Sequence, residues 1–83
     1  MAAKATRADF AMQRKIGREW REFRQEFLFT QTMLAEALGI SRRAVQIVES
    51  GKSNKPSWPG LPQTTTRLKF KALKAKYKGE AAS

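Results

Sequence analysis

Cysteine and histidine are both missing from the 83-residue sequence. Without cysteine, the chain cannot form disulfides or thiolate metal sites. Without histidine, it lacks the usual general base of enzymes and the commonest metal ligand of proteins. No glycine-rich phosphate-binding loop is present either. We therefore expect no metal site, no cofactor and no enzymatic activity.

Long hydrophobic runs are also missing. No apolar run approaches the roughly 18 residues of a membrane span. The opening residues, MAAKATRADF, lack the apolar centre of a signal peptide. We expect a soluble, cytoplasmic protein with no membrane partner. At this length the chain forms one small domain, and its eight aromatic residues suit a compact core.

Acidic residues are scarce: 7 against 17 basic ones, for a formal charge of +10. The surplus is uneven, because residues 52–83 hold eight basic residues and one acidic residue, a net +7. Such asymmetry indicates a polyanionic partner, either nucleic acid or a membrane surface. The alternative is a lysine-rich tail that only keeps the protein in solution.

Apolar residues at positions 12, 16, 20, 23 and 27 predict a helix over about 7–27, with Thr6 as its N-cap and residues 1–6 as a flexible N-terminus. We expect this stripe to be buried. Thr30 predicts the start of a second helix, which Gly39 ends. Ser41 predicts the start of a third helix, which Gly51 ends. Two short helices joined by a turn with glycine indicate a helix-turn-helix over 31–50.

Three prolines and a glycine exclude a helix from the segment KSNKPSWPGLPQ. Within it, we expect Trp58 to fill the core; the alternative is that its ring stacks on DNA. Helical spacing returns over about 63–78, where Gly79 predicts the end of a basic helix and of the domain, which runs over 7–78. We expect a disordered tail over 79–83.

The segment FTQTMLAEALGISRRAVQIVESGK resembles the helix-turn-helix of the lambdoid phage repressor and Cro family, also called the Xre family. The resemblance implies an all-α, lambda-repressor-like bundle of about four helices that binds double-stranded DNA. It also implies an ion pair between Arg24 and Glu49, which we expect to be buried. The chain departs from the family in its Pro-rich loop, in the basic helix that follows, and in Ile47, where the family often has a polar residue.

The third helix would enter the major groove, where side chains at its N-terminal end read bases. Arg42 and Arg43 hold the first exposed positions, and an arginine fork suits guanine O6 and N7. The alternative is that both arginines only hold phosphates or face water. Gln46 could reach a base or a phosphate. Ile47 could meet a thymine methyl group or only pack at the edge of the domain.

Phosphate contacts are expected from the start of the first motif helix, from the turn and from the loop that follows the recognition helix. The residues concerned are Gln31, Thr32, Ser41, Lys52, Ser53, Asn54 and Lys55. The lysines at 69, 71, 74, 76 and 78 form either a second contact with the DNA backbone or only a field that speeds encounter.

These features predict a sequence-specific DNA-binding transcriptional regulator, a small repressor of phage, plasmid or mobile-element type that binds DNA as a homodimer. Two other functions fit the same residues. One is an antitoxin that represses its own operon and contacts a toxin through the C-terminal helix, on the face formed by Leu68, Ala72 and Ala75. The other is a general nucleic-acid or RNA-binding module.

Overall fold

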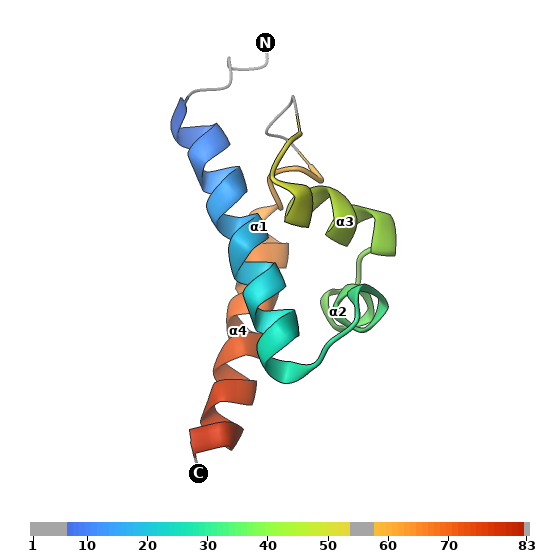
Figure 1. Ribbon diagram of the computed structural model, residues 1–83, viewed down its shortest axis with the longest axis vertical. Helices are drawn as coiled ribbons and strands as arrows, with labels where there is room; N and C mark the ends of the chain where they lie inside the picture. Colours follow the sequence, from blue (N-terminus) through green and yellow to red (C-terminus); the bar gives the residue numbers. More distant parts are fainter. Residues whose placement is uncertain (1–6, 54–57, 83) are drawn as a thin grey trace.

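The computed structural model describes residues 7–53 and 58–82 of the chain. It contains four helices, α1 (Arg7–Phe27), α2 (Gln31–Leu38), α3 (Arg42–Ser50) and α4 (Thr64–Ala82), and the described residues include no strand (Figure 1). The predicted all-α fold of four helices is confirmed. The expectations for Thr6, for a flexible segment 1–6 and for Ser83 fall outside the described residues. No helix in this part of the chain combines the length and apolar character that a membrane span requires.

Local signals at the helix ends agree with the sequence. Thr30 and Ser41 each accept a hydrogen bond on the side-chain oxygen from the backbone N–H three residues further on, at 3.0 and 3.1 Å. Gly39 and Gly51 end α2 and α3 with φ values of 70° and 61°, which glycine adopts without a steric penalty. These caps fix the lengths of both helices and therefore the geometry of the turn between them.

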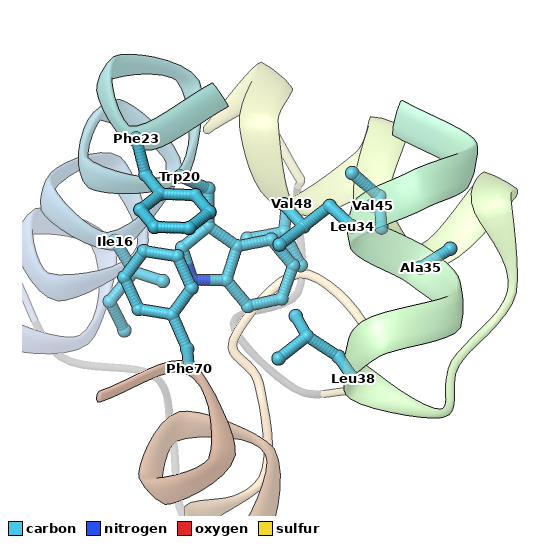
Figure 2. Close-up of a cluster of buried hydrophobic side chains, with 9 residues drawn as sticks. All are labelled: Ile16, Trp20, Phe23, Leu34, Ala35, Leu38, Val45, Val48 and Phe70. Carbon is cyan, nitrogen blue, oxygen red and sulfur yellow. The ribbon is translucent and has the colours of Figure 1, made fainter. Parts of the chain in front are cut away.

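The core forms where all four helices meet, around Trp20, which is 1% exposed. Figure 2 shows this indole between Phe70 of α4 and the aliphatic side chains of α2 and α3. The rings of Trp20 and Phe70 are stacked, with centroids 5.5 Å apart. The buried cluster consists of Ile16, Trp20, Phe23, Leu34, Ala35, Leu38, Val45, Val48 and Phe70. The central part of the predicted stripe on α1 is therefore core, as expected.

Met12, at the start of that stripe, departs from the expectation because it is 37% exposed. It lines a groove between α1 and α4, where Arg67 Nη2 lies 3.7 Å from its sulfur atom.

Trp58 is also not the core residue that we expected, because it is 41% exposed. In the loop before α4, the residues that face the core are instead Gly60 and Pro62, which are buried, and Leu61, which packs against the core. A Cβ on Gly60 would lie only 2.7 Å from Gln13 Oε1. The close approach of this backbone leaves no room for an indole.

The predicted end of the last helix is wrong. α4 continues through Gly79 to Ala82, so residues 79–82 are helical and not a disordered tail. Gly79 has ordinary helical backbone rather than a positive φ, and nothing lies within 4 Å of the place where its Cβ would be. A glycine inside a helix costs about 1 kcal/mol relative to alanine, which weakens a helix without ending it.

Candidate nucleic-acid interface

α3 has one face in the core and one face in solvent. Its buried residues are Ala44, Val45, Val48 and Glu49. On the other side, four side chains line one shallow depression at the surface: Arg42, Arg43, Gln46 and Ile47. The first three are exposed and Ile47 is half-buried. The structure therefore brings together all four residues that the sequence analysis expected to contact bases.

The side chain of Gln46 is oriented by a neighbour on α2. Gln46 Nε2 donates to Gln31 Oε1 at 3.3 Å, and Gln31 Nε2 in turn lies 3.4 Å from Glu49 Oε1. The amide of Gln31 thus bridges the exposed and the buried face of α3. This bridge could not be predicted from the sequence, because it joins side chains 15 and 18 residues apart on different helices.

Arg24 and Glu49 form the ion pair that ties α1 to the end of α3. Arg24 Nε donates to Glu49 Oε2 at 2.6 Å and Nη2 to Oε1 at 2.7 Å, so the contact is bidentate. Arg24 Nη1 also donates to the carbonyl oxygen of Phe29 at 3.2 Å. The side chains are 21% exposed for Arg24 and 4% for Glu49.

The hydrogen bond with Glu49 raises the pKa of Arg24 above its usual value; partial burial opposes this, and the charge of Glu49 adds to it. A pKa that is raised on folding contributes stability that is complete below the unfolded-state pKa and is lost only as the pH rises through the folded-state pKa. The Arg24 guanidinium therefore stays charged, and contributes fully, at every physiological pH.

Gly17 allows α1 and α3 to approach closely. A Cβ at this position would lie 2.3 Å from the carbonyl oxygen of Val48, closer than real contacts allow. A glycine inside a helix costs about 1 kcal/mol relative to alanine, so by its local effect alone Gly17 would only weaken α1. Its role depends on a neighbouring backbone that is distant in sequence, which the local pattern does not reveal.

The loop after α3 is held to α1 by Gln13, which is 0% exposed. Gln13 Nε2 donates to the carbonyl oxygen of Ser53 at 3.0 Å. This places Ser53, half-buried, and Lys52, exposed, directly beyond the C-terminal end of α3. Asn54 and Lys55 lie outside the described residues. Gln13 was not predicted from the sequence, although a polar residue four positions before Gly17, on the same side of α1, is a signal that could have identified it.

The other residues expected at phosphates lie at the starts of α2 and α3. Gln31 and Thr32 are the first two residues of α2, ahead of Met33, whose N–H is capped by Thr30. The first N–H groups of a helix have no partner within it, and they favour an anion. Ser41 Oγ is engaged in capping α3, but its hydroxyl hydrogen remains able to donate.

Among the described residues, no three side chains of His, Cys, Asp or Glu are grouped so that they could hold a metal ion. The arrangement offers arginine and amide donors on the exposed face of α3, with helix N-termini beside it. These groups recognise base edges and phosphates.

Comparison with known proteins agrees with this geometry. Residues 21–57 match the family described as Helix-turn-helix, a segment that contains α2, the turn and α3. No curated protein and no solved structure matches the chain. The ion pair, the two capped helices and the positive-φ glycine of the turn all lie within the matched segment. The match supports a DNA-binding helix-turn-helix in this part of the chain, similar to that of the phage repressor and Cro (Xre) family.

Proposed function

We propose that the protein is a sequence-specific repressor of phage, plasmid or mobile-element type, which binds its operator in the cytoplasm. In this proposal, α3 lies in the major groove, and Arg42, Arg43, Gln46 and Ile47 meet the base edges. The observation that carries the proposal is the depression on α3, because these four side chains share one surface while the opposite face of the helix is fixed in the core. Repression requires only that the operator be occupied.

Phosphate contacts would set the register of α3 on the duplex. The N-terminal N–H groups of α2, at Gln31 and Thr32, support a contact on one side of the groove. Ser41, Lys52 and Ser53 support contacts near the two ends of α3. Asn54 and Lys55 belong to the same proposal on the strength of the sequence alone. We further propose that two copies bind two half-sites about 34–36 Å apart, one helical turn of DNA.

Selection of bound sequences from a random pool of duplex DNA tests the proposal. We expect a preferred half-site that contains at least one G·C pair, repeated with two-fold symmetry about one turn away. The selected duplex should bind at least about 1,000-fold more tightly than random competitor. Equal binding of random duplex, single strands and structured RNA would instead indicate a general nucleic-acid module.

An antitoxin that represses its own operon is the second candidate. It is favoured by the groove between α1 and α4, since an antitoxin needs a surface for its toxin besides the one for DNA. The two candidates share the same contacts with DNA. Finding a protein that binds the chain and is neutralised by it would distinguish the antitoxin from a repressor that acts alone.

A further inference from the structure

A groove lies between α1 and α4, on a different face of the domain from α3. On α1, Gln13 and Gly17 face α3 and the loop after it, whereas Met12, Lys15 and Glu19 line the groove. In Figure 1, α2 and α3 extend to one side of α1, and α4 runs behind it. A partner in the groove would therefore leave the recognition helix free.

The floor of the groove is apolar. It encloses about 720 Å³, a volume typical of binding pockets. Leu68 projects into it and is 60% exposed, although α4 has already placed Phe70 in the core. The apolar lining consists of Met12, Ile16, Trp20, Leu68, Phe70 and Ala75. α4 thus has a second apolar face for which the described part of the chain provides no cover.

The rim of the groove is almost entirely cationic. Five basic side chains line it, with Glu19 as the single carboxylate; they are Lys15, Arg67, Lys71, Lys74 and Lys78. Two other lysines of α4, Lys69 and Lys76, do not line it. Lys69 instead extends towards α2, where its Nζ lies 3.7 Å from the position of a Cβ on Gly39. The lysines of α4 are therefore divided between two faces of the helix.

We propose that this groove binds an acidic amphipathic α-helix of a partner protein. The apolar stripe of such a helix would cover Leu68 and the floor, and its flanking carboxylates would meet the five cations. A second copy of the chain, docked groove to groove, fits poorly because the five cations of one rim would face the five cations of the other. Duplex DNA also fits poorly, since phosphates gain from the rim but nothing from an apolar floor. The proposal does not depend on DNA binding by α3.

Synthetic peptides test the groove directly. The probe is a fluorescent peptide of about 18 residues, roughly 27 Å as a helix, with leucines at i, i+3, i+4 and i+7 and glutamates elsewhere. Fluorescence anisotropy with the full chain, without DNA, should show saturable binding. A scrambled peptide of the same composition, which lacks the apolar stripe, should bind at least about tenfold more weakly. Equal binding of both peptides would overturn the proposal, because it would indicate only attraction between opposite charges.

Charge-reversal pairs on α4 provide a matched control. Lys71→Glu with Lys74→Glu changes the groove, whereas Lys69→Glu with Lys76→Glu removes the same charge from the same helix outside it. We expect the first pair to weaken peptide binding by at least about tenfold and the second pair by less than about threefold. Leu68→Ser, which alters no charge at an exposed position, should also weaken binding by several-fold. Equal effects of the two pairs would contradict the proposal.

Duplex DNA supplies the last arm of the experiment. The groove pair should reduce affinity for DNA no more than the control pair does. The contrary result is that the groove substitutions at Lys71 and Lys74 reduce DNA affinity more than the control substitutions do, while both pairs reduce peptide affinity equally. In that case the groove is a phosphate-binding surface and the proposal is wrong. Thermal unfolding of all variants establishes that each is folded.

Discussion

At the scale of single residues, Glu49 is the most consequential buried group. It accepts both hydrogen bonds of the bidentate pair with Arg24 and lies within reach of Gln31, so one carboxylate connects α1, α2 and α3. Its loss would leave the guanidinium of Arg24, which is only 21% exposed, without its counter-ion. The pair therefore links the stability of the fold to the position of the recognition helix.

Glu49→Ala should destabilise the protein strongly in the absence of DNA. Removing one member of a buried pair costs about 3–5 kcal/mol, and the remaining exposure of Arg24 places the effect near the lower limit. Urea unfolding followed by circular dichroism measures it. A loss of less than about 1 kcal/mol, as for pairs at the surface, would contradict the burial of this interaction.

Leu28 occupies a conformation that suits glycine better than leucine. Its φ is 58° and its side chain is 85% exposed, so it gains little from packing. The chain leaves α1 here, and the N–H of Phe29 donates to the carbonyl of Arg24 at 2.8 Å. Leu28→Gly should raise the free energy of unfolding by about 0.5–1 kcal/mol because it removes the left-handed strain. Leu28→Ala, which keeps that strain, should give no comparable gain in the same urea titration.

At the scale of helices, close packing of α1 on α3 depends on the missing side chain of Gly17. Gly79, in α4, is a glycine of the opposite kind, with nothing near the position of its Cβ. A substitution at Gly79 therefore measures only the intrinsic helix preference of the new residue, whereas one at Gly17 also measures the packing of α1 on α3.

Gly17→Ala should destabilise the protein by about 1–3 kcal/mol, although alanine favours helices, because the backbone of α3 must move away. Gly79→Ala should instead stabilise it by up to about 1 kcal/mol. Thermal unfolding of both variants tests the pair of expectations. Stabilisation by both substitutions would show that α1 and α3 are not in close contact.

Most of the fold could be predicted at this scale because its signals are local. The caps at Thr30 and Ser41 and the glycines that end α2 and α3 act within a few residues, and the stripe on α1 repeats at helical spacing. The features that could not be predicted depend on neighbours that are distant in sequence. Exposure of Trp58, for example, follows from how tightly the loop packs against Gln13.

The candidate site was predictable to a similar extent. The family pattern indicated which positions of α3 face outwards, and the structure places those side chains in one depression. The family pattern did not reveal the bridge through Gln31, the support of Ser53 by Gln13 or the division of lysines on α4. These features require side-chain positions from more than one helix.

At the scale of the whole molecule, the charge of +10 should act mainly on affinity and little on specificity. Replacing Lys69 and Lys76, the two lysines of α4 outside the groove, by glutamine should flatten the dependence of log affinity on log salt, by about 0.9 for each lost phosphate contact. The preferred sequence should not change. Arg18→Gln with Arg21→Gln, on the exposed side of α1, is the control and should leave the slope nearly unaltered. An unchanged slope in the lysine variant would show that these two lysines of α4 do not contact DNA.

The central claim is that α3 reads bases through its first two arginines. The measurement that tests it most directly is the affinity for every single-base variant of the selected operator, for the wild type, Arg42→Ala and Arg43→Ala. Both side chains are exposed, so the variants should remain folded. We predict that at least one variant loses its preference at a single G·C position of each half-site, by about 1–3 kcal/mol, and keeps its other preferences. If both variants weaken all operators equally, the arginines hold only phosphates, and the claim is wrong.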